Sequence, residues 1–302
     1  MSKSFRDGAQ FAWDATSLTL AQTCLRKYKY RLIDGWQPRR LSVHLLFGQV
    51  YATALEHFYK YRAEGQTIDE ALVAVVHEAM ISTWNSEKQI AVEFDHNAKT
   101  RFNLIRSIVW YIDEFGEEST SGIQTHHLSD GKPAVELSFT LNITDEIVFC
   151  GHLDRVVSYG GDLYVMDQKT TGTTITPRFF DGFKPDNQMS MYTFAGQAIL
   201  HSPVKGVIID GAQIAVGFTR FERGFTFRTQ AELDEWFDEA LDLIAHVRHS
   251  TLDQKFPMNR TACGNYGGCE FRNVCSRSPQ VRDQFLKADF VKAPVWDPLS
   301  RR

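Results

Sequence analysis

Two adjacent glycines in the middle of the chain constrain its fold most strongly. Gly160 and Gly161 separate two apolar, β-rich runs, and a Gly-Gly pair in that setting predicts a two-residue β-hairpin turn. With the turn at these glycines, antiparallel pairing places Asp154 opposite Asp167. Lys169 lies two residues beyond Asp167 and shares its face of the sheet. The sequence therefore predicts two carboxylates and an amine on one face of a hairpin.

This arrangement predicts a particular chemistry. Two opposed carboxylates repel each other, and a divalent cation such as Mg²⁺ or Mn²⁺, which binds carboxylate oxygens, removes the repulsion. A lysine beside such a metal can orient a water or stabilise charge that develops on a phosphate. The pattern favours a phosphodiesterase. The alternative is an exposed hairpin with scattered charges, but the apolar flanks place the hairpin in a central sheet, where unpaired charges are costly.

Composition sets limits on the class of protein. The chain has 302 residues, 43% of them hydrophobic and 23% charged, as in ordinary globular proteins. No apolar run approaches about 18 residues, and the N-terminus lacks the apolar stretch of a signal peptide, so we expect a location in the cytoplasm of a prokaryote or a phage-infected cell. The net charge is −4, so nucleic acid must be bound by a local basic patch. No GxxxxGK[ST] segment is present, and any ATP motor must come from a partner.

Hydrophobic periodicity predicts the element order. Helices are expected over 17–32, 48–62, 67–84, 97–115, 186–200 and 230–248. Strands are expected over 134–141, 147–157, 162–169, 207–216 and 221–228. The order α-β-β-β-α-β indicates an α/β core with a mixed central sheet, a helical N-terminal region and a Cys-rich C-terminal tail. We expect three parts, 1–95, 96–250 and 251–302, with the tail packed as one unit with residues 1–35.

Three of the five cysteines lie close together in the tail. Cys263, Cys269 and Cys275 form a C-x5-C-x5-C pattern rich in glycine, which allows a tight loop around a metal. Cys24, on the basic N-terminal helix, is the expected fourth ligand, because Cys150 lies in a predicted core strand. Four thiolates suit zinc or an iron–sulfur cluster, and the absence of close C-x2-C pairs favours the cluster. Buried free cysteines are the alternative.

Together, these motifs resemble the PD-(D/E)XK nuclease superfamily, and most of all its RecB-type branch, which includes the CRISPR-associated exonucleases and phage-encoded relatives. The matching segments are Gly151-x-x-Asp154 for G-x-x-D, Asp167-x-Lys169 for (D/E)-x-K and Gln188-x-x-x-Tyr192 for Q-x-x-x-Y. The resemblance implies a restriction-endonuclease-like core and a [4Fe–4S] cluster on the four cysteines. Gln188 and Tyr192 lie four residues apart on one helix face, where they can support the lysine or contact DNA, or pack the helix on the sheet.

One position departs from the family pattern. Family members usually carry a metal-binding His after the glycine that opens the second helix, whereas Tyr51 or Ala52 stands there in this chain. Candidate replacements are Glu56, Glu136 on the first strand and His152, which the hairpin register places on the face of Asp154. His57 is a poorer substitute, because it points about 100° away from Glu56 on an ideal helix.

The resemblance implies a Mg²⁺- or Mn²⁺-dependent DNA exonuclease that acts on single-stranded ends in recombination, repair or phage DNA processing, with a possible helicase or recombination partner. Asp154 and Asp167 would hold the metal, and Lys169 would position the attacking water. Basic residues of the N-terminal region would line a strand passage, with Tyr28, Tyr30 and Trp36 for base stacking. They are Arg26, Lys27, Lys29, Arg31, Arg39 and Arg40. The alternatives are a DNA-binding accessory protein with an inactive nuclease fold and a redox-sensing iron–sulfur protein.

Overall fold

The predicted hairpin is present in the computed structural model. Strands β9 (Ile147–Tyr159) and β10 (Asp162–Thr171) are joined by Gly160 and Gly161, whose φ angles are 60° and 88°. Two successive positive φ angles define a type I′ turn, whose twist matches that of the flanking strands and which glycine adopts without strain. The pairing runs from Tyr159 with Asp162 to Arg155 with Met166. This is the register that the sequence predicts.

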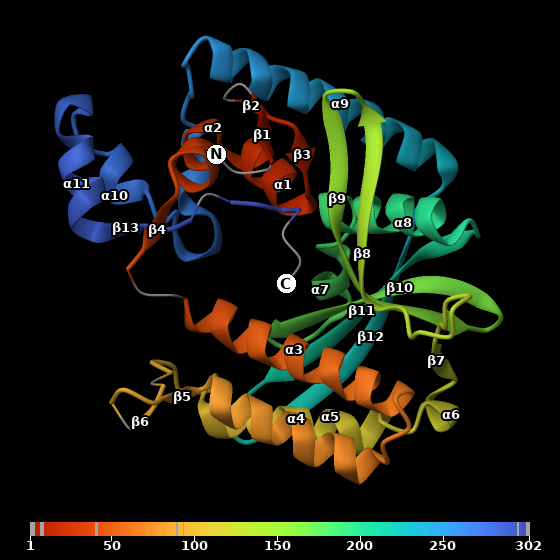
Figure 1. The fold of residues 1–302 in the computed structure, drawn as a ribbon. Helices are drawn as coiled ribbons and strands as arrows, with labels where there is room; N and C mark the ends of the chain where they lie inside the picture. Colours follow the sequence, from red (N-terminus) through yellow and green to blue (C-terminus); the bar gives the residue numbers. More distant parts are fainter. Residues whose placement is uncertain are drawn as a thin grey trace. The chain divides into compact units, whose positions relative to one another are not determined.

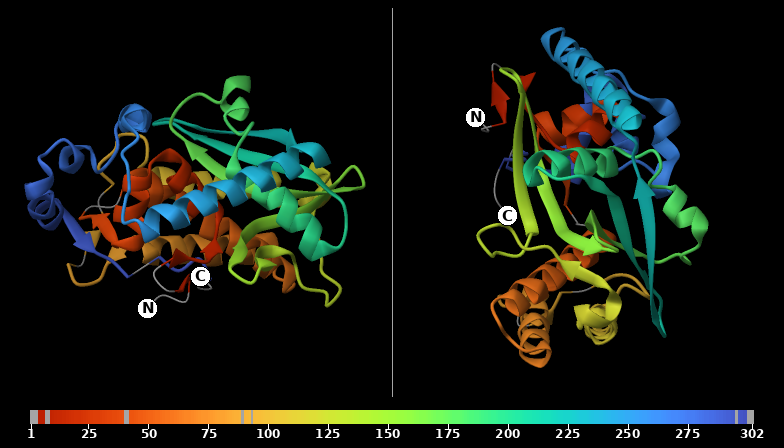
Figure 2. Two further views of the ribbon diagram at one scale, coloured as in Figure 1. Left: turned by 90° about the horizontal axis from the view of Figure 1, so that it is seen from above. Right: turned by 90° about the vertical axis from the view of Figure 1, so that its right-hand side faces the viewer.

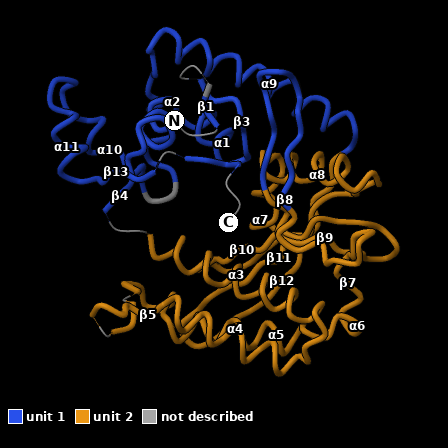
Figure 3. Tube along the Cα trace, viewed as in Figure 1, with its two compact units in different colours: residues 1–41, 138–151, 229–302 blue, residues 42–137, 152–228 orange. Residues whose placement is uncertain are grey.

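The structure describes residues 4–6, 9–39, 42–88, 90–92, 94–294 and 296–299. The chain forms two compact units, shown in Figure 3. Unit 1 contains residues 1–41, 138–151 and 229–302, and unit 2 contains residues 42–137 and 152–228. Strand β9 and strand β8 (Val135–Thr144) each belong partly to both units.

The described residues form a central sheet of mixed direction, drawn in Figure 1. Its order is β12-β11-β10-β9-β3, and β7 and β8 also pair with β9. The remaining strands are β3 (Ala12–Trp13), β7 (Ile123–Thr125), β11 (Val204–Ile214) and β12 (Thr219–Phe227). β10 and β11 are parallel, whereas β9–β10 and β11–β12 are antiparallel. The mixed α/β fold class is confirmed.

Helices cover both faces of the unit 2 sheet (Figures 1 and 2). On one face, α3 (Val43–Ala63), α4 (Ile68–Ser82) and α5 (Arg101–Phe115) share a hydrophobic core with strand residues such as Ala212 and Ile214. On the other face, α8 (Asn187–Leu200) packs through Gly196 against Val165 and Val204. Shorter elements of this unit are β5 (Trp84–Asn85), β6 (Ile90–Ala91), α6 (Glu118–Ser121) and α7 (Pro177–Asp181).

Unit 1 holds the N-terminal and C-terminal segments. Its N-terminal elements are β1 (Phe5–Arg6), β2 (Ala9–Gln10), β3, α1 (Ala15–Thr23), α2 (Leu25–Tyr28), the π-helix η1 (Lys29–Ile33) and β4 (Trp36–Pro38). Its C-terminal elements are α9 (Gln230–Leu252), the 3₁₀ segments η2 (Arg260–Gly267) and η3 (Pro279–Val281), α10 (Arg272–Cys275), α11 (Arg282–Asp289) and β13 (Phe290–Lys292). β4 and β13 pair antiparallel, so the two segments meet in a small sheet.

The single helix predicted over 17–32 is wrong. Asp14 begins α1 through a capping box with Ser17, and Cys24 ends it because its backbone is extended, with φ −170° and ψ 115°. The chain then resumes as α2 and η1. Apolar periodicity continues across the break, which is why the sequence pattern alone does not reveal it.

The other long helices form close to their predicted ranges, because side-chain caps fix their first turns. Thr67 and Glu70 form a capping box at α4, and Thr229 and Glu232 form one at α9. Thr100 caps α5. Helix α3 begins at Val43, before the predicted start at Gly48. Within the described ranges, no helix has both the length and the apolar character needed to cross a membrane.

Candidate active site

The β9–β10 hairpin brings the two predicted carboxylates together in unit 2. Its last pair joins Arg155, the residue after Asp154, to Met166, the residue before Asp167. The Asp154 carboxylate accepts a hydrogen bond from the backbone N–H of Gln168 at 3.2 Å, so its side chain lies against the opposing strand. The juxtaposition therefore follows directly from the Gly-Gly turn and the period of two along each strand.

Asp167 is the most constrained group of the site. Only 1% of the residue is exposed, and one carboxylate oxygen forms an ion pair with the ammonium of Lys169. The other oxygen, Oδ1, has no hydrogen-bond partner in the part of the chain that the structure describes. A buried carboxylate oxygen without a partner is costly, and a cation is the ligand that removes the cost.

Helix α8 holds the Lys169 side chain in place through a hydrogen bond. The Lys169 ammonium donates to Gln188 Oε1 at 2.9 Å, and Gln188 Nε2 donates to the Tyr192 hydroxyl at 3.0 Å. Asp186 begins this helix by accepting hydrogen bonds from the backbone N–H groups of Gln188 and Met189, at 2.8 and 3.1 Å. Gln188 therefore contacts Lys169 directly and Tyr192 contacts Gln188, which is the arrangement that the lysine-supporting interpretation requires.

Electrostatics at the site favour a further positive charge. Burial, reinforced by the neighbouring charge of Asp167, raises the pKa of Asp154 to about 7. Burial likewise raises the pKa of Asp167, although Lys169 opposes it. Burial lowers the pKa of Lys169, but the two carboxylates outweigh it and the net shift is upward. One ammonium therefore serves a buried carboxyl and a partly buried one, and a second cation is needed for both to ionise fully at neutral pH.

Two of the three secondary metal candidates lie beside this pair. His152 Nδ1 is 3.8 Å from Glu136 Oε1, and the charge of Glu136 contributes to the raised pKa of Asp154. Glu136 has a φ of 49°, which is uncommon for a non-glycine residue. Glu56 instead pairs with Lys60 one turn along α3, at 2.5 Å. Within the described ranges, no three His, Cys, Asp or Glu residues are gathered closely enough to hold a metal ion.

Tyr51, one of the two residues that stand where the family His is expected, points into the core. It is 1% exposed, its ring meets that of Tyr111 edge-on, and its hydroxyl is buried without a hydrogen-bond partner in the described structure. Burial raises the pKa of Tyr51, and the nearby Asp210 raises it further. His57 is bonded to Glu78 at 2.6 Å. The structure therefore gives no sign that either residue replaces the His.

Several residues near the site are not among the candidates that the sequence motifs predict. Asp186 raises the pKa of Asp167 by its charge, and its position two residues before Gln188 was a readable helix-cap signal. Asp210 of β11 pairs with Arg223 of β12 at 3.1 Å and accepts from the Tyr111 hydroxyl. No local pattern predicts this network, because its members lie far apart in the sequence.

A buried lysine adjoins the end of β10. Lys99 is 2% exposed and donates to the Thr170 hydroxyl at 3.3 Å, and its ammonium lies 5.4 Å from the Phe47 ring centroid. Burial lowers its pKa to about 8. No sequence motif singles out this lysine.

The four candidate cluster cysteines lie in unit 1. Cys24 stands at the α1–α2 junction, where its sulfur accepts from the backbone N–H of Asn259 at 3.3 Å. Burial raises the pKa of Cys275, Arg26 opposes it, and the thiols of Cys269 and Cys24 add to it. Cys263 also contributes to a raised pKa of Cys269. The four thiols are thus electrostatic neighbours, although they are not gathered as tightly as a metal site requires.

Cys150 is separate from this group, as the sequence predicted. It is buried and donates weakly to the Trp13 carbonyl at 3.7 Å. Burial raises the pKa of Cys150 strongly. It therefore resembles an ordinary core cysteine.

The predicted aromatic stacking surface is wrong in part. Tyr28 is fully buried, and its hydroxyl donates to Gln10 at 2.6 Å, so it offers no face to a base. Tyr30 and Trp36 belong to a buried cluster with Phe271 and Phe290. Among the predicted basic residues, Arg26 and Lys29 line a pocket of unit 1, and Arg39 bonds to backbone carbonyls of α11. Arg40 lies outside the described residues.

A central hairpin that carries Asp154, Asp167 and Lys169, with Gln188 and Tyr192 on α8, is the arrangement of motifs typical of PD-(D/E)XK nucleases. The family model of the PD-(D/E)XK nuclease superfamily matches residues 12–276, and the chain belongs to this superfamily.

Comparison with solved structures gave matches at low sequence identity. A protein titled "Putative exonuclease" from Eubacterium rectale matches with a TM-score of 0.50 and 10% identity, over 90% of this chain and 91% of that one. The structure titled SSO0001 matches with a TM-score of 0.34 and 11% identity, over 90% and 87% of the two chains. Comparison with curated proteins gave no significant match.

Proposed function

We propose that this protein is a Mg²⁺- or Mn²⁺-dependent DNA nuclease of the RecB-type branch, acting as an exonuclease on single-stranded DNA ends in recombination, repair or phage DNA processing. The observation that carries the proposal is the contact chain from Asp167 through Lys169 to Gln188, beside Asp154. A helicase or recombination partner and a cytoplasmic location belong to the same proposal. So does the three-part division into 1–95, 96–250 and 251–302.

The residues present fit a divalent cation. Asp167 Oδ1 has no hydrogen-bond partner in the described structure, and Asp154 needs a second positive charge to ionise at neutral pH. Asp154 and Asp167 would hold the metal, with Glu136 and His152 as further candidates. When bound, such a cation polarises the scissile phosphate and lowers the pKa of a bound water.

Lys169 has two roles in this proposal. In the metal-free protein its ammonium is the counter-ion of Asp167, and its raised pKa keeps it protonated at neutral pH. With the carboxylates neutralised from another side, the ammonium can donate to the attacking water or to a phosphate oxygen. Gln188 accepts one of the three ammonium protons and so fixes the direction of the remaining two.

Gln188 should therefore act as a positioning residue. We expect Gln188→Ala to lower kcat about 10- to 100-fold with little change in KM, because a misplaced amine costs transition-state stabilisation more than substrate binding. Steady-state cleavage of a labelled oligonucleotide measures both constants. Tyr192→Phe, which removes only the hydroxyl that accepts from Gln188, is the milder companion variant. Equal kcat in Gln188→Ala and wild type would contradict the role.

We further propose that Cys24, Cys263, Cys269 and Cys275 hold a [4Fe–4S] cluster. Their mutual electrostatic influence and the glycine-rich η2 segment support it. In Cys275→Ser, we expect loss of the broad absorbance near 400 nm, loss of bound iron and a lower Tm, since metal binding is coupled to folding. Cys150→Ala is the matched control, because Cys150 lies apart from the four. Stoichiometric zinc in place of iron in fully active protein would contradict the cluster.

The direct test of the function is a digest of 5′- and 3′-labelled single- and double-stranded oligonucleotides with Mg²⁺ and Mn²⁺. We expect release of short products from single-stranded ends. The second candidate function, DNA binding by an inactive nuclease fold, is favoured by the burial of Tyr51 where the family His is expected. Strand binding without cleavage under every metal would establish that alternative.

A further inference from the structure

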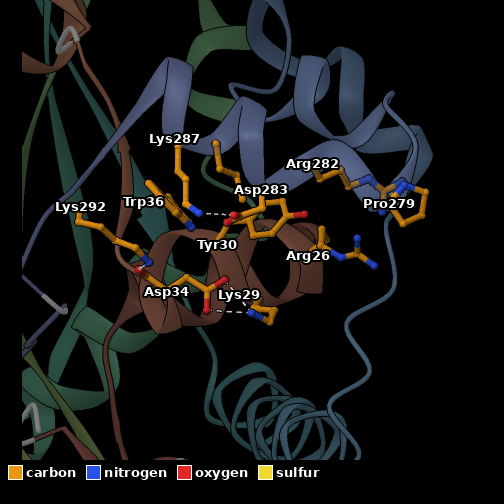
Figure 4. Close-up of a pocket in the computed structure, with 11 residues that line it drawn as sticks. Arg26, Lys29, Tyr30, Asp34, Trp36, Pro279, Arg282, Asp283, Lys287 and Lys292 are labelled. Carbon is orange, nitrogen blue, oxygen red and sulfur yellow. Dashed lines mark hydrogen bonds and ion pairs between the residues drawn. The ribbon is translucent and has the colours of Figure 1, made fainter.

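Unit 1 contains a basic pocket whose lining includes none of the candidate active-site residues Asp154, Asp167 and Lys169. It has a volume of about 860 Å³ and lies between the segment that contains α2 and η1 and the segment that contains α11, as Figure 4 shows. Its lining has five basic side chains and two acidic ones, an excess of three positive charges. The basic residues are Arg26, Lys29, Arg282, Lys287 and Lys292. The whole chain is net −4, so this excess is a local concentration of positive charge.

Three of these cations lack a carboxylate partner in the described structure. The two acids are engaged by the other two: Lys29 pairs with Asp34 at 2.7 Å, and Lys287 pairs with Asp283 at 2.5 Å (Figure 4). Within the described residues, the remaining three donate hydrogen bonds only to neutral backbone carbonyls. Arg26 donates to Phe256 at 2.7 Å, Arg282 donates to Arg277 and Cys275 at 3.0 and 3.1 Å, and Lys292 donates to Asp34.

This bonding holds each charge in place without neutralising it. A guanidinium has five N–H donors, and neither Arg26 nor Arg282 uses more than two of them in the described structure. The remaining donors are available to an anionic ligand. Arginine and lysine held in this way are suited to phosphate oxygens.

The two aromatic side chains of the pocket are not placed for base stacking. Tyr30 is 7% exposed and Trp36 is 8% exposed. The Lys292 ammonium lies 4.1 Å from the Trp36 ring centroid, and the Arg26 guanidinium lies 6.0 Å from that of Tyr30. Because the pocket's own cations cover these rings, its recognition elements are charges rather than ring faces.

We propose that this pocket binds the phosphate backbone of a single nucleic acid strand and does not read or stack its bases. The strand as ligand rests on the proposed nuclease function, whereas the phosphate chemistry rests on the lining itself. The pocket volume is that of a site for a ligand much larger than one phosphate, and its charges come from two separate segments. Binding should therefore be independent of base sequence.

The test measures strand binding without cleavage. Fluorescence anisotropy in EDTA gives Kd for a labelled 15-nucleotide dT strand and for an abasic strand of equal length, at several salt concentrations. The variant is Arg282→Gln/Lys292→Gln, which removes two of the three pocket cations that have no carboxylate partner in the described structure. The matched control is Lys132→Gln/Lys255→Gln, which changes net charge equally at exposed ion-paired lysines outside the pocket.

We expect the pocket variant to weaken binding roughly 10- to 30-fold at 0.1 M salt. The slope of log Kd against log salt concentration should fall by about 1.4, which is about 0.7 for each of the two lost phosphate contacts. The control should change Kd less than about threefold, and the abasic strand should bind as well as dT. Equal Kd for pocket variant and control would overturn the site. Abasic binding more than tenfold weaker would overturn recognition without bases.

The proposed nuclease function can be tested separately from the proposed pocket. Cleavage of the small diester bis(p-nitrophenyl) phosphate with Mn²⁺ reports the chemistry of unit 2 alone, and the pocket variant should cleave it as the wild type does. If the wild type binds strands through the pocket but cleaves neither substrate, the nuclease proposal fails and the pocket stands. If the wild type cleaves both substrates but does not bind strands through the pocket, the pocket proposal fails and the nuclease proposal stands.

Discussion

Lys169→Ala should lose cleavage by about 10³-fold or more while remaining folded. The reason is that Lys169 is the only cation in contact with Asp167 in the described structure, and removing a preorganised donor at a phosphate typically costs two to three powers of ten. Single-turnover cleavage of an end-labelled strand with Mg²⁺ measures the loss, and circular dichroism checks the fold. Lys205→Ala, at an exposed lysine paired with Asp162, is the control. Undiminished single-turnover cleavage in Lys169→Ala would refute the proposed mechanism.

Asp154→Asn should abolish cleavage and also stabilise the metal-free protein at alkaline pH. The folded-state pKa of Asp154 is about 7, against 3.8 for the free side chain, because burial and Asp167 disfavour its charge. A carboxyl whose pKa is raised on folding contributes its stability at low pH and loses it as pH rises through the folded-state value. The free energy of unfolding of the wild type in EDTA should therefore fall as the pH rises from about 4 to about 7.

The size of this effect is limited by solvent. Asp154 is only partly buried, so water screens its charge. We expect the free energy of unfolding of Asp154→Asn to exceed that of the wild type by about 1–3 kcal/mol at pH 8, which corresponds to a rise in Tm of about 2–6 °C. Below about pH 3.8, where the side chain is protonated in both the folded and the unfolded state, the variant and the wild type should have the same Tm. Thermal unfolding across this pH range in EDTA measures the difference. A variant that is less stable than wild type at pH 8 would show that Asp154 is held by contacts rather than strained by its charge.

The sequence was sufficient for the centre of the site because its geometry is local. A Gly-Gly turn fixes the register of β9 and β10, and a period of two then decides which side chains share a face. The position of Gln188 and Tyr192 on one face of α8 likewise follows from their spacing of four residues. The central contact chain therefore needed only short-range rules.

The remaining features depend on contacts that sequence spacing does not encode. Cys24 interrupts the first helix through its backbone conformation, although the apolar pattern continues past it. Tyr28 looked available for bases but packs face to face with Trp13 at 5.9 Å. The Asp210–Arg223 pair and the buried Lys99 likewise depend on tertiary placement. The C-terminal half of the basic pocket was missed because its cations alternate with acids along α11.

The most direct measurement of the central claim is Mn²⁺ binding, followed by electron paramagnetic resonance, in wild type, Asp167→Asn and Lys169→Ala. If paired carboxylates hold the cation, wild type should bind Mn²⁺ at a site that Asp167→Asn loses. Lys169→Ala should retain that site, and bind Mn²⁺ at least as tightly, because a competing positive charge is gone. Unchanged Mn²⁺ affinity and stoichiometry in Asp167→Asn would contradict the account.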